Sequence, residues 1–201
     1  MTLESDKTLG GVGALLVVIG FLGFFASGYV AILALIGMII TLIALKGMSD
    51  HYKEAGIFNN ALYGVITLII GVVAFIATLA VVILMTLSSF AIDWSDPAAI
   101  QAYFMNFNNI WSIIGIVIVA LVVLFAFAIV SAIFFRKSLT ILSTKSGENI
   151  FATAGLLWLI GAVLTIILVG FILIGIAWIL IAVGFFSIKP TAPPQPPPPP
   201  S

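Results

Sequence analysis

The sequence contains no cysteine and few charged residues. None of its 201 residues is Cys, and only 7% are Asp, Glu, Lys or Arg, whereas 63% are hydrophobic. The absence of thiols excludes disulfides, thiolate metal sites and cysteine nucleophiles. Because a soluble domain carries about 25% charged residues, a folded chain with so few could not cover its surface with polar groups. The composition therefore predicts an integral membrane protein whose main partner is the lipid bilayer.

Net charge is absent as well. Seven Lys and Arg residues balance seven Asp and Glu residues, so the chain has no overall basic field to attract nucleic acid, and we expect no nucleic-acid partner. The N-terminal stretch carries Glu4 and Asp6 against Lys7, whereas a cleavable signal peptide begins with a positive region. We therefore expect the first apolar run to remain in the protein as a membrane span.

Positive charge is missing from one polar segment. All seven cations can be placed on one side of a membrane: Lys7, Lys46, Lys53, Arg136, Lys137, Lys145 and Lys189. The polar segment 93–109 carries only acidic charge. Because cytoplasmic loops of membrane proteins are enriched in Lys and Arg, the pattern predicts that the cation-bearing side and both termini are cytoplasmic. The expected location is the plasma membrane.

The lengths of the apolar runs predict six membrane spans. The run 9–45 is too long to cross a bilayer once, and its small residues 26–28 suit a turn. The run 150–188 has no polar break, and Gly170 is its best turn candidate by analogy with Gly28. We predict an all-α integral membrane protein, in which a membrane domain (1–189) forms a six-span helical bundle arranged two plus two plus two. The expected spans are about 9–25, 29–46, 61–86, 110–135, 150–168 and 171–188.

The first and last predicted hairpins resemble each other in sequence. Residues 15–20 (LLVVIG) resemble 156–161 (LLWLIG), and residues 36–44 resemble 174–182, with Gly at matching positions in each pair. This similarity indicates a parallel repeat of the two hairpins around a central pair of spans. The alternative is chance, because Leu, Ile and Gly are common in any membrane helix.

The acidic segment between the third and fourth spans predicts a short helix in the membrane interface. Asp96 and Pro97 are typical of a helix start. Apolar side chains then recur at a helical spacing, and tryptophans bracket the segment. Trp and Tyr favour the headgroup level, so the candidate interfacial anchors are Trp94, Tyr103, Phe104, Phe107 and Trp111. A lid over an opening on that side is the alternative.

The predicted spans contain no Asp, Glu, Lys, Arg or His in their interiors. Proton-coupled pumps generally keep an ionisable group inside the bilayer, so this absence argues against that class. Hydroxyl side chains within the spans are expected to bond to backbone carbonyls, although a pore lined by them is an alternative. Glycines seven residues apart share one helix face and allow close helix packing, which makes Gly13, Gly20, Gly64 and Gly71 candidate packing residues.

Few residues of the sequence could take part in catalysis or metal binding. His51 is the sole histidine, and we interpret 50–54 as a solvated linker helix with Asp50 and Glu54 four residues apart on one face. Catalytic metal sites usually need three converging protein ligands. Asp93 and Asp96 have no identifiable base or nucleophile near them in sequence. We therefore assign no catalytic, cofactor-binding or metal-binding residue, and expect neither a cofactor nor an enzymatic activity.

The C-terminal segment 190–201 is rich in proline and is predicted to be a disordered, extended tail. The spacing of Pro190, Pro193 and Pro194 fits the grooves of polyproline-binding modules, so a cytoplasmic protein of that kind is a candidate partner. Residues 190–193 (PTAP) also resemble a short late-domain motif. A plain solvated spacer is the alternative.

Three stretches of the chain resemble one family. They are LESDKTLG (3–10), IALKGMSD (43–50) and IFNNALYG (57–64), followed by the final apolar hairpin and the proline-rich end. Together they are similar to an uncharacterised family of archaeal and bacterial multi-pass membrane proteins, domain of unknown function 996, over about residues 1–190. The resemblance implies membrane residence and no reaction. It draws attention to residues 46–50 and 58–60, which flank the second and third spans.

Two functional hypotheses remain. The first is a non-enzymatic membrane scaffold or organiser, held together by small-residue helix packing, whose tail recruits a soluble partner. The second is a channel or facilitator for a small or apolar solute that passes between the hairpins. A homo-oligomer is compatible with either hypothesis.

Overall fold

The computed structural model describes residues 2–24, 28–89, 95–167 and 169–189. This part of the chain contains helices and no strands. In chain order the elements are α1 (Leu3–Phe24), the 3-10 helix η1 (Gly28–Ala31), α2 (Ile32–His51), α3 (Ala55–Ser89), α4 (Pro97–Met105), α5 (Phe107–Ser146), α6 (Ile150–Leu164), the 3-10 helix η2 (Thr165–Ile167) and α7 (Val169–Ser187).

Six of the described helical segments are long and apolar enough to cross a membrane. They are Leu3–Gly23, Gly28–His51, Ala55–Val81, Ile114–Ser146, Ile150–Ile167 and Val169–Ser187. The predicted all-α bundle is therefore confirmed, with six helices in the described residues that are long and apolar enough to span a membrane. The prediction works because each helix is specified locally by an apolar run of sufficient length.

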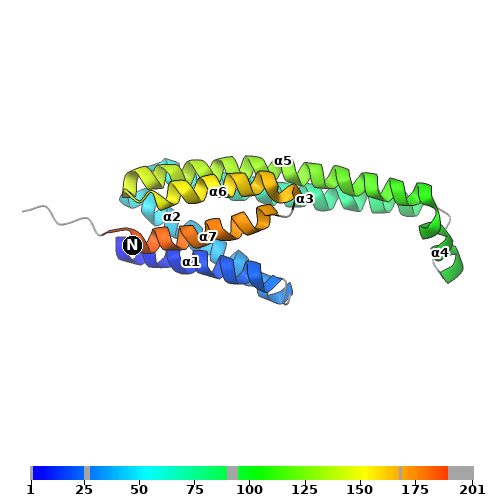
Figure 1. Cartoon of the computed structure of the whole chain (residues 1–201), viewed down its shortest axis with the longest axis horizontal. Coiled ribbons are helices and arrows are strands. Elements are labelled where there is room, and N and C mark those ends of the chain that lie inside the picture. Colours follow the sequence, from blue (N-terminus) through cyan, green and yellow to red (C-terminus); the bar gives the residue numbers. More distant parts are fainter. Residues whose placement is uncertain (1, 25–27, 90–94, 168, 190–201) are drawn as a thin grey trace, which may run out of the picture.

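The helices form three antiparallel hairpins (Figure 1). We call α3–α5 the central hairpin and call α1–α2 and α6–α7 the outer hairpins. Helix α6 packs against α5, and α7 packs against α1, so that the two outer hairpins also touch each other. Both outer hairpins start and finish at the same end of the molecule (Figure 1). This is the arrangement that a parallel repeat requires, and the internal repeat itself stays a prediction.

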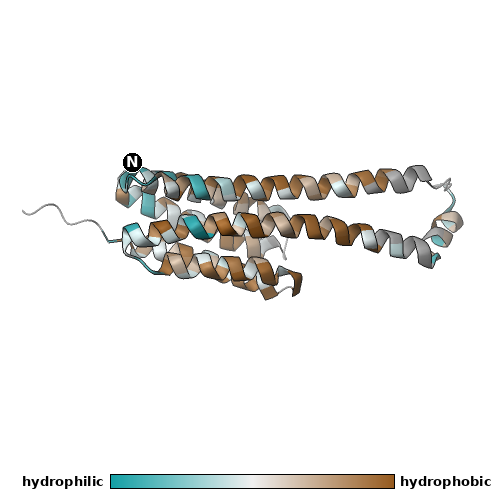
Figure 2. Cartoon of the chain, turned by 90° about the horizontal axis from the view of Figure 1, so that it is seen from above, coloured by the Kyte–Doolittle hydropathy of each residue, from teal (hydrophilic) through white to brown (hydrophobic). Residues whose placement is uncertain are grey.

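The hairpins differ greatly in length. Helices α3 and α5 have 35 and 40 residues, which corresponds to about 52 and 60 Å at about 1.5 Å per residue. Helices α1, α2, α6 and α7 have 22, 20, 15 and 19 residues. The central hairpin therefore extends well beyond the outer hairpins, and α4 lies at its tip (Figures 1 and 2). We call the tip the far end and the opposite end, where the outer hairpins begin, the charged end.

Aromatic side chains hold the outer and central hairpins together. The ring of Phe135 in α5 stacks on Trp158 in α6 with centroids 4.6 Å apart, and Trp158 lies 4.8 Å from Trp178 in α7. Phe151 and Phe185 meet edge to face at 5.2 Å. Lipid tails are as apolar as these side chains, so the contacts stabilise the bundle through close packing more than through exclusion of water.

Two predicted helix boundaries are wrong at the charged end. Helix α1 begins at Leu3 instead of near residue 9, so the acidic N-terminal stretch is helical. Helix α5 continues beyond the predicted end at about residue 135, so that Arg136, Lys137 and Lys145 lie on it. The reason is that buried side chains continue between these cations, as at Leu139 and Leu142, so tertiary packing extends the helix through the charged stretch. The connection to α6 shrinks to residues 147–149, where Gly147 adopts a φ of 77°.

The turn of the last hairpin also differs from the prediction. Gly170 lies inside α7, and the chain reverses before it, after η2. A Cβ atom on Gly170 would overlap the backbone of Gly161 and Thr165. Glycine is needed here for the close approach of α6 and α7, and it does not form the turn itself. In the first hairpin, the predicted turn residues 26 and 27 lie outside the described residues.

The segment at the far end is helical, with one correction. Helix α4 starts at Pro97, and the Asp96 carboxylate accepts a hydrogen bond of 2.8 Å from the Ala98 N–H. Tyr103 and Phe104 belong to α4, but Phe107 is the first residue of α5. The predicted helical face therefore does not include Phe107, because α4 ends at Met105 and α5 begins after Asn106. Trp111 is 57% exposed on α5, whereas Trp94 lies outside the described residues.

The four candidate packing glycines lie at contacts between helices. A Cβ atom on Gly13 would lie 2.8 Å from the Thr41 backbone nitrogen, and one on Gly20 would overlap the backbone of Ala34. Gly64 and Gly71 face α5 in the same way, against Phe135 and Phe127: a Cβ on Gly64 would lie 2.8 Å from the Phe135 ring, and one on Gly71 would overlap Phe127 Cβ. These four positions bring the backbones of α1 and α2, and of α3 and α5, closer than a side chain would allow.

Candidate functional site

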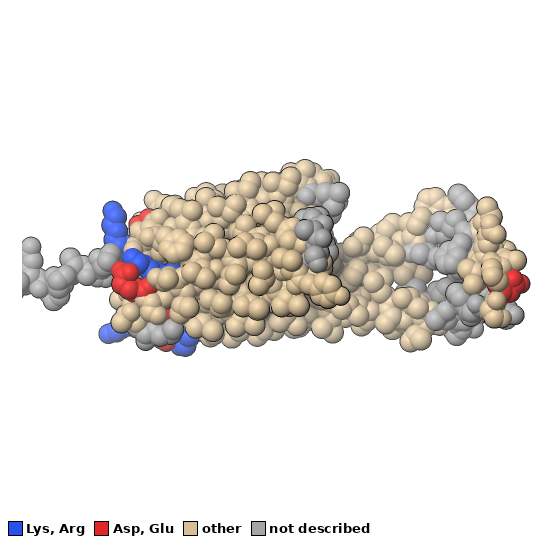
Figure 3. All heavy atoms as spheres, turned by 90° about the horizontal axis from the view of Figure 1, so that it is seen from below, with Lys and Arg blue, Asp and Glu red and all other residues tan. Residues whose placement is uncertain are grey.

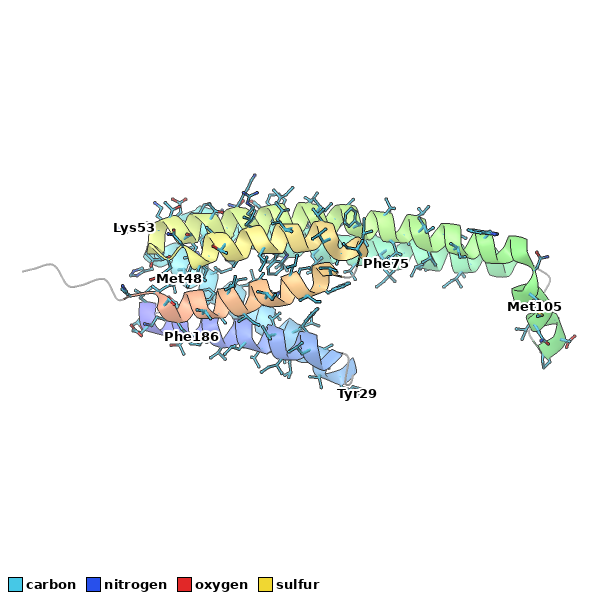
Figure 4. All side chains as sticks on the ribbon, in the orientation of Figure 1. Tyr29, Met48, Lys53, Phe75, Met105 and Phe186 are labelled. Carbon is cyan, nitrogen blue, oxygen red and sulfur yellow. The ribbon has the colours of Figure 1, made fainter. Side chains whose placement is uncertain are left out.

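Charged side chains collect at one end of the molecule. Figure 3 shows Lys and Arg side chains, together with acidic ones, gathered at the charged end, while the far end shows acidic atoms. The turn between α2 and α3 lies at the charged end, where Figure 4 labels Met48 and Lys53. Two of the stretches that carry the family resemblance, 43–50 and 57–64, flank this turn, so we describe it as the candidate site.

The α2–α3 turn is tight and is held by backbone and side-chain hydrogen bonds. The Ser49 hydroxyl donates to the Glu54 carbonyl at 3.0 Å, and the Glu54 N–H donates to the Ser49 carbonyl at 2.9 Å. Lys53 adopts the left-handed region with a φ of 51°. The predicted linker helix over 50–54 is therefore wrong, because α2 stops at His51 and the Ser49 hydrogen bonds reverse the chain into α3.

Ion pairs lie beside this turn. Lys46 Nζ lies 2.7 Å from Asp50 Oδ1 and 5.6 Å from the centre of the Phe58 ring. Lys145 of α5 lies 3.2 Å from Glu54 Oε2. The paired side chains are all more than a third exposed, and exposed pairs contribute little stability. Their role is to define the charge pattern of the surface.

Two shallow pockets flank the Lys46–Asp50 ion pair. One has a volume of about 320 Å³ and is lined by Asp6, Ile43, Lys46, Gly47, Asp50 and His51. The other has a volume of about 360 Å³ and is lined by Lys46, Ser49, Asp50, Lys53, Glu54, Ala55, Phe58 and Asn59. Groups of both charge signs, the His51 imidazole and the Phe58 ring line these pockets.

Asp6 is the buried charged residue that sequence reasoning missed. Its side chain is 1% exposed, and its Oδ1 atom accepts no hydrogen bond from the described residues. The carboxyl lies against Gly47 so closely that a Cβ there would overlap it. Two of the family-like stretches, 3–10 and 43–50, therefore meet at this point. Their pairing is the sequence signal that could have pointed to the contact.

Tyr52 is the other titratable group with a distinct environment. Burial raises the pKa of its hydroxyl, and the nearby Glu148 carboxylate raises this pKa further. Tyr52 therefore remains a neutral hydroxyl below its ordinary pKa of about 10. The described residues hold no group of three His, Cys, Asp or Glu side chains that could bind a metal ion.

Comparison with known proteins places this chain in a family. The model of a family described as "Protein of unknown function (DUF996)" matches residues 33–179. The chain belongs to this DUF996 family. A similar protein, an uncharacterised protein of Methanocaldococcus jannaschii, is 30% identical over 188 residues, which cover 94% of each chain. No solved structure matches the chain.

The DUF996 match includes the α2–α3 turn and the central hairpin, whereas Asp6 precedes the matched region. The family is one of unknown function, so membership assigns no reaction to the pockets. The candidate tail residues Pro190, Pro193 and Pro194 lie outside the described residues, and no part of the structure bears on their partner.

Proposed function

We propose that the protein is a non-enzymatic membrane scaffold that recruits a soluble partner to the cytoplasmic face of the plasma membrane. In this proposal the charged end and both termini are cytoplasmic. The observation that carries it is the position of the end of α7, from which the tail continues. Helix α7 ends at the charged end, where Lys7 Nζ donates to the Ile188 carbonyl at 3.3 Å. The last described residues before the proline-rich segment, Ile188 and Lys189, therefore lie at the charged end, which also carries the α2–α3 turn.

The packing of the bundle favours the scaffold hypothesis over the channel hypothesis. The Ser131 hydroxyl donates to the Gly64 carbonyl across the central hairpin at 2.8 Å, and Thr41 and Thr78 donate to carbonyls of their own helices at 2.8 Å. Hydroxyls that donate to backbone carbonyls in this way have a structural role in the helices and in the contact between α3 and α5. A facilitator for a small or apolar solute is the second candidate, and solute flux in proteoliposomes would favour it over the scaffold.

The tail is expected to select the partner. Replacing Pro190, Pro193 and Pro194 together with Ala should remove one or more proteins that copurify with the full-length chain from detergent-solubilised membranes. The reason is that polyproline-binding grooves require these rings at a fixed spacing. Affinity purification followed by mass spectrometry measures the effect. The matched control replaces Thr191 and Gln195 with Ala, and an identical partner set for all three proteins would contradict the proposal.

The side of the membrane can be tested separately, because the chain has no native Cys. A Gln195→Cys variant should resist a membrane-impermeant thiol reagent in intact cells and react after lysis. A Gln101→Cys variant on α4 should react in intact cells, because α4 lies at the opposite end of the molecule (Figure 1). Labelling of residue 195 in intact cells would place the tail outside and refute a cytoplasmic adaptor.

A further inference from the structure

The turn of the α6–α7 hairpin is apolar and exposed. Ile166 is 71% exposed and Ile167 is 60% exposed. The polar side chain of this turn, Thr165, uses its hydroxyl to donate to carbonyls of α6, at Gly161 and Ala162. Turns that meet water normally carry Gly, Pro, Asn, Asp or Ser. Exposed isoleucines at a chain reversal instead indicate that hydrocarbon surrounds it.

The α1–α2 hairpin also exposes apolar side chains beside its turn, although the turn itself carries Ser27 and Gly28. Leu22 is 62% exposed and Ile32 is 55% exposed on either side of its turn. No charged residue occurs between Lys7 and Lys46. Tyr29, labelled in Figure 4 at the end of this hairpin, is 86% exposed. The 3-10 segments η1 and η2 adjoin the two turns, and such segments keep backbone groups hydrogen-bonded where helices end.

The packing register shows how far the outer hairpins reach along the central hairpin. Gly155 of α6 lies against Arg136 of α5, where a Cβ would be 3.2 Å from the Arg136 Cα. Because α5 and α6 are antiparallel, the turn after Ile167 is level with about residue 124 of α5. Helix α5 continues for about 25 Å beyond that level, back to Phe107, with α3 beside it. Figure 3 shows a broad charged end and a narrower projection.

The projecting part of the central hairpin is apolar on its outside. Ile76 and Leu84 on α3 are 58% and 65% exposed, and Ile118 and Val122 on α5 are 54% and 59% exposed. The sequence has no charged residue in 55–92 or 97–135. Exposing each such side chain to water costs about 1.5–3 kcal/mol relative to burial. The projecting part is therefore far more stable in lipid than in water. Polar groups return at α4, beyond Trp111.

We propose that the protein is a wedge in the bilayer. The central hairpin reaches the far interface, whereas the outer hairpins turn inside the hydrocarbon. The distance from Arg136 to Trp111 along α5 is about 38 Å, which a tilt can fit into a hydrocarbon layer of about 30 Å. Its midpoint is about residue 124, the level at which the α6–α7 hairpin turns, and Figure 1 shows the α1–α2 hairpin ending at about the same level. The leaflet at the charged end therefore contains six helices and the far leaflet contains two.

The acyl chains of the far leaflet therefore cover the exposed sides of the projecting part. Lipid fits these sides because aliphatic side chains point outward from both α3 and α5. The shape displaces more lipid from one leaflet than from the other. The partner that this surface fits is a membrane that is convex on the side of the charged end. This inference does not depend on the tail or on any soluble partner.

Nitroxide labels on single cysteines test the wedge, because their depth in proteoliposomes can be measured by collision with oxygen and with a polar nickel complex. Labels at Ile166, Tyr29 and Ile118 should collide with oxygen and be protected from nickel. Labels at Gln101 and Lys53 should be accessible to nickel and serve as interface references. All five positions are exposed, so the labels should not disturb packing.

Three results would overturn the proposal. Nickel accessibility at Ile166 or Tyr29 equal to that at Gln101 would place the outer turns at an interface. Nickel accessibility at Ile118 would place the projecting part in water. Spin–spin broadening at Ile118 that disappears on dilution with unlabelled protein would place a second copy of the chain, instead of lipid, against α5. Thermal melting of each labelled protein, unchanged from the parent, ensures that the depths refer to the folded bundle.

Discussion

Gly20→Leu is expected to separate α1 from α2 and to destabilise the protein severely. A Cβ at this position would overlap the backbone nitrogen of Ala34 and lie 2.8 Å from its Cα. Backbone atoms in a membrane helix cannot rotate away as a flexible side chain can, so the helices must move apart. Overpacking costs about 1–3 kcal/mol and sometimes more. At the upper end of this range, about 3 kcal/mol, and at roughly 2–4 °C per kcal/mol, we expect Tm in detergent to fall by about 6–12 °C.

Gly115→Leu is the matched control for this prediction. Gly115 also lies in an apolar membrane helix, but a Cβ there would meet no atom within 4 Å. Loss of a mid-helix glycine should raise helix stability by up to about 1 kcal/mol, so its Tm should be unchanged or slightly higher. Equal losses of Tm in the two variants would show that helix glycines matter for a reason other than the α1–α2 contact.

The parts of the fold that the sequence predicts are those that depend on local hydropathy. An apolar run of sufficient length specifies a membrane helix whatever it packs against, which is why the six helices follow from the sequence. The end of α5 cannot be predicted from local hydropathy. Its cations give a polar stretch, and only the burial of Leu139 and Leu142 against neighbouring helices keeps that stretch helical. A boundary set by tertiary packing cannot be read from one segment alone.

The candidate site shows the same limit more strongly. The sequence drew attention to residues 46–50 and 58–60, and the structure lines a pocket with Lys46, Phe58 and Asn59. The sequence assigns no packing role to Asp6, yet its side chain is buried against Gly47. The two residues are far apart in the chain, and neither has a local pattern that reveals the other. Their contact depends on the antiparallel register of α1 and α2.

The wedge predicts that the protein should orient itself according to membrane curvature. A helix about 10 Å in diameter occupies roughly 80 Å² of a leaflet, so four additional helices add roughly 300 Å² at the charged end. In small vesicles the outer leaflet is the expanded one. Protein reconstituted into small sonicated vesicles should therefore point its charged end outward in most copies. In large extruded vesicles the bias should be weaker, because the two leaflets are nearly equal in area.

The Gln195→Cys variant measures this orientation directly, because the fraction that reacts with an impermeant thiol reagent before detergent is the fraction whose tail lies outside. No cellular machinery acts in these vesicles, so charge-dependent insertion does not determine the result. Gln101→Cys is the reciprocal control, and its accessible fraction should fall as that of residue 195 rises. Vesicles made with anionic and with uncharged lipids separate the effect of shape from attraction between headgroups and cations. An accessible fraction that depends on lipid charge and not on vesicle size would contradict the wedge, because area asymmetry acts through curvature alone.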